Sequence, residues 1–195
     1  MPWDRPDVAS AFTLEETAQR LGSYRWVELR LYEAMGSWVD TIGDLDVRLA
    51  VGSGCTIHAW HASVLLDRLP AGRDPEALTR PATEGVNALL DRVASAADPL
   101  ERLVGAYRVV VPRLVAAYTA HLNHTSAAAD APTARALGLV LADEVAAWRE
   151  GELLVQSLIV SAADARRAAD HQARIEALIA GAGGLAGAAT LRPRG

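Results

Sequence analysis

The chain has 195 residues, of which 51% are apolar and 5% aromatic, and 24 acidic residues against 19 Lys and Arg give a formal net charge of −5. This length suits one domain with a substantial core, and the acidic balance without a basic, aromatic-rich stripe argues against nucleic-acid binding. The single cysteine, Cys55, excludes an internal disulfide, and neither a signal core nor a run of about 18 apolar residues is present. We therefore expect a soluble cytoplasmic protein with no membrane partner.

Alanine and leucine dominate and strand-like alternation is nearly absent, which favours an all-α fold. Residues 1–12 contain two prolines, and we expect an extended N-terminal arm there. Thr13 and Glu16 have the spacing of a capping box, which predicts the start of a long first helix. We expect this helix to reach about Thr41.

The second predicted helix is capped by Asp44 or Asp46 and continues to Pro70. The Pro- and Gly-rich stretch 69–83 and a short amphipathic helix over 84–96 follow. This connection is too long for a tight hairpin and long enough to return along a bundle. The third long helix is therefore expected to start at the end where the second one began.

Asp98 followed by a proline predicts the start of the third long helix, and Pro112 is expected to kink it. The fourth helix is expected to begin near Pro132, and Ser161 resembles the N-cap of a fifth helix over 162–180. Together these features predict an N-terminal arm over 1–12, a helical bundle over 13–180 and a flexible tail over 181–195.

Polar side chains occupy otherwise apolar helix faces at the middle of the predicted bundle. Glu28 lies about fifteen residues before the turn near Gly43 that joins the first two helices, and His58 lies about fifteen residues after it. The two residues therefore share one height in an antiparallel hairpin. His61 lies one turn from His58, and Glu144 reaches the same level from the fourth helix. Asp143 points about 100° away from Glu144, so we leave it out of the group.

Burying these groups without partners costs on the order of 1–3 kcal/mol for a neutral polar group and more for an ion. The buried polar groups must therefore be compensated by one another, by a metal ion, by water or by a substrate. Cys55 is interpreted as a small core residue, and His121 and His124 as solvated residues near a helix end. Five aromatic side chains are candidates for the lining of a pocket: Tyr24, Trp60, Tyr107, Tyr118 and Trp148.

The pattern of an acid on the first helix, imidazoles on the second and an acid on the fourth resembles the ferritin-like superfamily. The segments 24–30, 58–61 and 141–144 are similar to those of actinobacterial ferritin-like proteins of poorly defined function. The resemblance covers about residues 13–180. It implies a ferritin-like four-helix bundle with a long crossover connection, here with an extra C-terminal helix, and a dinuclear iron or manganese site.

This chain departs from the two-metal pattern of that superfamily. No Glu-x-x-His pair is present on the second helix, Ala147 stands three residues after Glu144, and the third helix offers no acid near 107–111. We therefore expect at most a reduced site for one iron or manganese ion, with the ligands Glu28, His58, His61 and Glu144.

Three functions remain open from the sequence. The first is a metal-dependent oxidative step on a small, largely apolar substrate in bacterial, including specialised, metabolism. The second is a metal-free cyclase, isomerase or lyase, in which Glu28 or Glu144 is the general base and His61 the general acid. The third is a non-catalytic binding or scaffold protein in which Glu28 and His61 form a buried ion pair. The fifth helix would cover the bundle or form a homodimer contact.

Overall fold

The computed structural model describes residues 11–126 and 130–186, and within them every regular element is a helix, which confirms the all-α class. A π-helical segment, η1, joins two α-helices into one long rod. In chain order the elements are α1 (Leu14–Val39), α2 (Leu45–Leu66), α3 (Pro75–Leu78), α4 (Glu84–Ala94), α5 (Pro99–Leu103), η1 (Val104–Val110), α6 (Val111–Asn123), α7 (Ala131–Leu158) and α8 (Ala162–Gly181).

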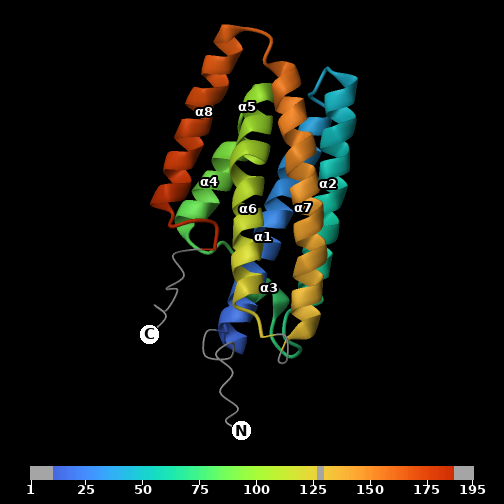
Figure 1. Ribbon diagram of the computed structural model, residues 1–195, viewed down its shortest axis with the longest axis vertical. Coiled ribbons are helices and arrows are strands. Elements are labelled where there is room, and N and C mark those ends of the chain that lie inside the picture. Colours follow the sequence, from blue (N-terminus) through green and yellow to red (C-terminus); the bar gives the residue numbers. More distant parts are fainter. Residues whose placement is uncertain (1–10, 127–129, 187–195) are drawn as a thin grey trace.

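Four long rods run side by side: α1, α2, the continuous α5–η1–α6 rod, and α7 (Figure 1). Helix α1 packs along α2, and α6 packs along α7. The connection through α3 and α4 brings the chain back to the end where α2 began, so α2 and the α5–η1–α6 rod run in the same direction (Figure 1). Helix α8 lies outside these rods, against α4 and η1.

Helix starts follow the capping residues that the sequence offers. In α1 the Thr13 N–H donates to Glu16 Oε2 at 2.8 Å and the Glu16 N–H donates to Thr13 Oγ1 at 3.2 Å, which completes the predicted capping box. The side chains of Asp44, Asp98 and Ser161 accept hydrogen bonds from backbone N–H groups in the first turns of α2, α5 and α8. Helix ends differ more: α2 ends at Leu66, four residues before Pro70.

The third rod contains a π-helical turn directly before Pro112, where the sequence predicts a kink. Proline has no N–H to donate, and its ring crowds the carbonyl four residues back, so a regular α-helix cannot continue unchanged there. In the structure the Val111 N–H donates to the carbonyl of Ala106, five residues earlier. The wider turn of η1 is thus where the helix accommodates the proline.

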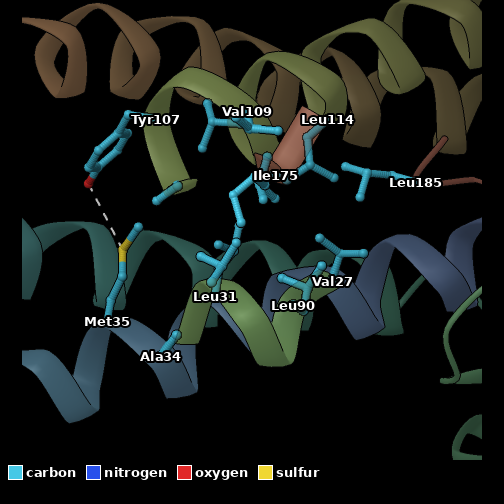
Figure 2. Packing of buried hydrophobic residues seen from close by; sticks show 14 of the residues in the cluster. Val27, Leu31, Ala34, Met35, Leu90, Tyr107, Val109, Leu114, Ile175 and Leu185 are labelled. Carbon is cyan, nitrogen blue, oxygen red and sulfur yellow. Dashed lines mark hydrogen bonds between the residues drawn. The ribbon is translucent and has the colours of Figure 1, made fainter. Parts of the chain in front are cut away.

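Tyr107, on η1, passes between two glycines of neighbouring helices. A Cβ added to Gly151 of α7 would lie 2.1 Å from Tyr107 Cγ, and one added to Gly54 of α2 would lie 2.9 Å from the Tyr107 hydroxyl. The ring points towards Met35, whose Sδ lies 3.9 Å from the hydroxyl oxygen (Figure 2). Glycine is needed at both positions because the tyrosine occupies the space of a side chain.

Both ends of the described chain pack against the bundle. The Phe12 N–H donates to the carbonyl of His124 at 2.9 Å, which fixes the last residue of the predicted arm. Leu185 is 3% exposed and belongs to the apolar core (Figure 2). Residues 181–186, which the sequence analysis assigned to the tail, thus include side chains that pack against the bundle. Residues 1–10 and 187–195 lie outside the described part of the chain.

Helix α2 is long and apolar enough to cross a membrane by length and composition alone, which the sequence analysis did not anticipate. Only 33% of its apolar window is buried inside the protein. One such helix is weak evidence for a membrane span. In the structure α2 lies along α1 and contacts α7, and it carries the buried His58 and His61.

Candidate metal centre

Four polar side chains from three helices meet inside the bundle: Glu28 of α1, His58 and His61 of α2, and Glu144 of α7. Each is at most 1% exposed. One donor atom from each lies within 4.8 Å of all the others. The structure thus brings together the four residues that register arithmetic placed at one height.

Both imidazoles present Nδ1 to the same two carboxylates. His58 Nδ1 lies 2.6 Å from Glu28 Oε2 and 3.4 Å from Glu144 Oε1. His61 Nδ1 lies 3.0 Å from Glu144 Oε1 and 3.5 Å from Glu28 Oε1. Two nitrogens and two carboxylates therefore face one small volume.

The charges of this cluster depend on one another. Burial disfavours protonation of His58, but Glu28 and Glu144 outweigh burial and raise its pKa to about 9. Burial likewise opposes the charge on His61, and its hydrogen bonds to the same carboxylates raise its pKa to about 10. Burial disfavours the Glu28 carboxylate, yet the two imidazoles lower its pKa to about 2. Without another cation, protonated His58 and His61 would therefore compensate the negative charge of Glu28.

Tyr118 of α6 orients Glu28. Its buried hydroxyl donates a short hydrogen bond to Glu28 Oε1. Burial and the nearby negative charge of Glu28 raise the pKa of Tyr118 well above its usual value, so the phenol stays protonated and remains a donor. Tyr24 packs edge-on against Tyr118, with ring centroids 5.0 Å apart, and donates to the carbonyl of Ala117. Tyr24 therefore supports Tyr118.

Asp143 approaches His61 from the other side of the ring, a contact that the sequence analysis missed. Its Oδ2 lies 3.5 Å from His61 Nε2, and its side chain is 49% exposed. If His61 carries its proton on Nε2 and directs it at this carboxylate, Nδ1 is left to face Glu28 and Glu144. Carboxylates outside a metal site orient the ligating histidines in the same manner. The available signal was that Asp143 precedes Glu144 on a helix expected to lie beside His61.

Buried atoms without partners test whether these residues fit a metal ion. Glu144 Oε2 and His58 Nε2 are buried and have no hydrogen-bond partner among residues 11–126 and 130–186. An oxygen in this position has lone pairs available for a cation, since no donor in the described residues uses them. Imidazole nitrogen and carboxylate oxygen are ligands that iron, manganese and zinc accept. The group could therefore hold one metal ion, whose identity the donor set leaves open.

The two tryptophans proposed as pocket walls are both partly exposed, and Trp148 lines a groove at the surface rather than a space beside the four buried donors. Trp60 is 45% exposed and packs beside His61, with ring centroids 5.4 Å apart. Trp148 is 41% exposed. It lines a groove of about 730 Å³ between α7, η1 and α8, together with Arg108, Val145, Arg149, Glu152, Leu153 and Gln172. Both residues were chosen because they lie close to His61 and Glu144 along the chain, but a residue next to His61 on a helix points about 100° away from it.

His121 is a further correction, because it is 1% exposed rather than solvated. Its ring lies against Phe12 and Tyr24, and neither ring nitrogen has a hydrogen-bond partner in the described part of the chain. Burial lowers the pKa of His121 to about 4. Cys55 packs against the core as interpreted, and burial raises its pKa, which disfavours a nucleophilic role.

Comparison of the chain with protein-family models, with curated proteins and with solved structures finds no significant match.

Proposed function

We propose that the protein binds one divalent transition-metal ion, of the iron or manganese type, and uses it in an oxidative step on a small, largely apolar molecule. The observation that carries the proposal is the gathering of four buried donor atoms within 4.8 Å of one another. Two imidazole nitrogens and carboxylate oxygens are a donor set that suits non-haem Fe(II). Its ligands would be Glu28, His58, His61 and Glu144.

Charge balance supports a divalent ion at this position. Buried ions require compensation, and Glu28 and Glu144 together carry two negative charges when ionised. One divalent cation would neutralise both carboxylates while His58 and His61 bind it as neutral imidazoles. The same cluster binds two protons when no cation is present.

The surrounding residues hold the donors in place. The Tyr118 hydroxyl donates a hydrogen bond to Glu28 Oε1, which leaves Glu28 Oε2 directed at the four-donor site. Asp143 takes the Nε2 side of His61, so that Nδ1 faces the carboxylates. When bound, an iron or manganese ion would supply Lewis-acid and one-electron chemistry. The bundle itself keeps bulk water away from the four donors.

The helix arrangement supports a ferritin-like bundle as the scaffold of this function. Four long rods with a crossover between the second and third carry the donors on α1, α2 and α7. The third rod contributes the phenol of Tyr118 where a dinuclear site would need a carboxylate. This difference favours one ion over two.

A metal-free acid–base enzyme is the second candidate, and one contact favours it. His58 Nδ1 and Glu28 Oε2 lie 2.6 Å apart, which is the distance of a charge-assisted hydrogen bond between an acid and a base. In this reading Glu28 or Glu144 is the general base and His61 the general acid in a cyclisation, isomerisation or elimination.

Elemental analysis of protein purified without chelator separates the two candidates. We expect about one iron or manganese ion per chain, lost in Glu28→Gln and in Glu144→Gln. Glu152→Gln is the matched control, since Glu152 is an acid of the same helix α7 that pairs with Arg108. Oxygen uptake by the Fe(II)-loaded protein should disappear with the ion. Absence of metal after anaerobic reconstitution with Fe(II) would overturn the proposal, and a chelator-insensitive, bell-shaped pH profile would support acid–base chemistry.

A further inference from the structure

The four donors of the candidate metal centre are closed off from solvent. Glu28, His58, His61 and Glu144 are each at most 1% exposed. A metal site needs an entry path as well as ligands, because an ion arrives from water with a hydration shell that it exchanges for donor atoms. The side of the site at which solvent comes closest is therefore the side at which an ion has the fewest contacts to open.

Two polar side chains outside the cluster contact its ligands, and they differ in exposure. Tyr118 of α6, which donates to Glu28, is 0% exposed and packs against Tyr24, itself 1% exposed. Asp143 of α7, whose Oδ2 lies 3.5 Å from His61 Nε2, has a side chain that is 49% exposed. The site is therefore closed by two buried rings on the Tyr118 side, whereas on the Asp143 side it comes close to solvent.

The His61 ring lies between the Asp143 carboxylate and the other donors. It presents Nε2 to Asp143 and Nδ1 to Glu144, which lies 3.0 Å away. The ring also packs beside Trp60, which is 45% exposed. Helices α2 and α7 lie side by side (Figure 1) but pack against each other less extensively than α1 and α2 do. Between α2 and α7, the wall of the site is thus one imidazole thick.

Given a site that binds a divalent ion, as proposed above, we infer that the ion enters between α2 and α7, with Asp143 as the carboxylate that receives it and the His61 ring as the gate. An exposed carboxylate attracts a cation and replaces part of its hydration shell. Rotation of the His61 side chain about its Cα–Cβ bond then opens the way to Glu144 and Glu28, both of which its ring contacts. Asp143 acts on the rates of entry and exit and is not a ligand of the bound ion.

A residue on the entry path and a residue that only orients His61 change different rate constants. A carboxylate on the path stabilises the ion while it crosses the wall, so its removal slows association and dissociation by similar factors and changes the dissociation constant little. A group that only orients His61 stabilises the bound state, so its removal speeds dissociation and weakens affinity. Asp143→Asn separates the two roles, because Asn has the size of Asp and keeps an oxygen to accept from His61 Nε2 but carries no charge.

Stopped-flow mixing of the metal-free full chain with Co²⁺ measures entry, because the visible absorption of Co²⁺ changes when nitrogen and oxygen donors replace water. Mixing Co²⁺-loaded protein with excess EDTA measures exit. We expect both rate constants to fall about tenfold in Asp143→Asn and to stay at the parental values in Asp143→Glu, which keeps the charge. Added salt should slow association in the parent and not in Asp143→Asn. Glu152→Gln is the matched control, because it removes a negative charge from the opposite side of α7, nine residues along the helix.

The same measurements separate a wrong entry path from a wrong metal site. Co²⁺ binding to Asp143→Asn at the parental rates would overturn the entry path and leave the metal site standing. Faster dissociation with unchanged association would also overturn the entry path, since that is the result of an orienting role. A parent protein that binds neither Co²⁺ nor Fe²⁺ would overturn the metal site and the entry path together. Circular dichroism verifies that each variant folds as the parent does.

Discussion

Replacing Gly151 with alanine tests the packing of Tyr107 beside the Glu/His cluster. The added Cβ would lie 2.1 Å from Tyr107 Cγ and 2.2 Å from Cδ1, far inside the ordinary contact range of 3.4–4 Å. Neither the buried ring of Tyr107 nor the backbone of α7 can move far enough to relieve this contact without cost. We therefore expect overpacking to cost about 1–3 kcal/mol or more, which exceeds the gain of about 1 kcal/mol from alanine's helix propensity.

Gly138→Ala is the matched control on the same helix α7. A Cβ there would meet nothing within 4 Å, so the free energy of unfolding should rise by about 0.5–1 kcal/mol. Thermal unfolding followed by circular dichroism should show shifts of opposite sign, at about 2–4 °C per kcal/mol for a chain of this size. Combining Gly151→Ala with Tyr107→Ala should remove the clash. Equal upward shifts for Gly138→Ala and Gly151→Ala would refute the packing argument.

Three further predictions concern charge and hydrogen bonding. Metal-free protein should release close to two protons for each divalent ion that it binds at pH 7, because the pKa values of His58 and His61 are raised to about 9 and about 10. Calorimetry in two buffers of different ionisation enthalpy measures the number of protons released. Release of less than one proton per ion would contradict the prediction. Tyr118→Phe removes a donor to the buried Glu28 carboxylate and should lower the free energy of unfolding by about 1.5–3 kcal/mol; an unchanged urea midpoint would contradict the assigned bond. Stability should fall as the pH drops from 6.5 towards 4, since burial lowers the pKa of His121 to about 4 and the unfolded chain binds the proton first. The His121 share of this loss, up to about 3 kcal/mol, should be missing in His121→Leu, whereas the share of His171, whose pKa burial also lowers, should remain; an equal loss in His121→Leu and the parent would contradict the assignment.

Local signals explain why the helix starts could be predicted from the sequence. A capping side chain lies within three residues of the N–H group that it accepts from, so Thr13, Asp98 and Ser161 carry the information themselves. The shared height of Glu28 and His58 also follows from counting outwards from one short turn. Helix length and hairpin geometry were sufficient for this part of the site.

Features that depend on neighbouring helices could not be predicted in the same way. The depth of His121 depends on Phe12, which reaches it from the N-terminal segment across more than a hundred residues of chain. The contact of Asp143 with His61 depends on how α7 is rotated against α2. The exposure of Trp60 and Trp148 depends on the same rotations, which a hydrophobic pattern along one helix does not determine.

Removing the whole polar cluster separates a structural role from a functional one. Replacing a buried ion pair by apolar residues of similar volume is often neutral or stabilises a protein by about 1–4 kcal/mol, whereas deleting one partner leaves an uncompensated charge. We therefore expect a variant with Leu or Met at Glu28, His58, His61 and Glu144, and with Tyr118→Phe, to fold with undiminished stability in urea unfolding. Glu144→Leu alone should be strongly destabilised, because the two imidazoles would lose a carboxylate that both contact. A fully apolar variant several kcal/mol less stable than the parent would show that the cluster holds the fold together. If the apolar variant keeps its stability but no longer binds metal, these five residues are needed for function rather than for folding.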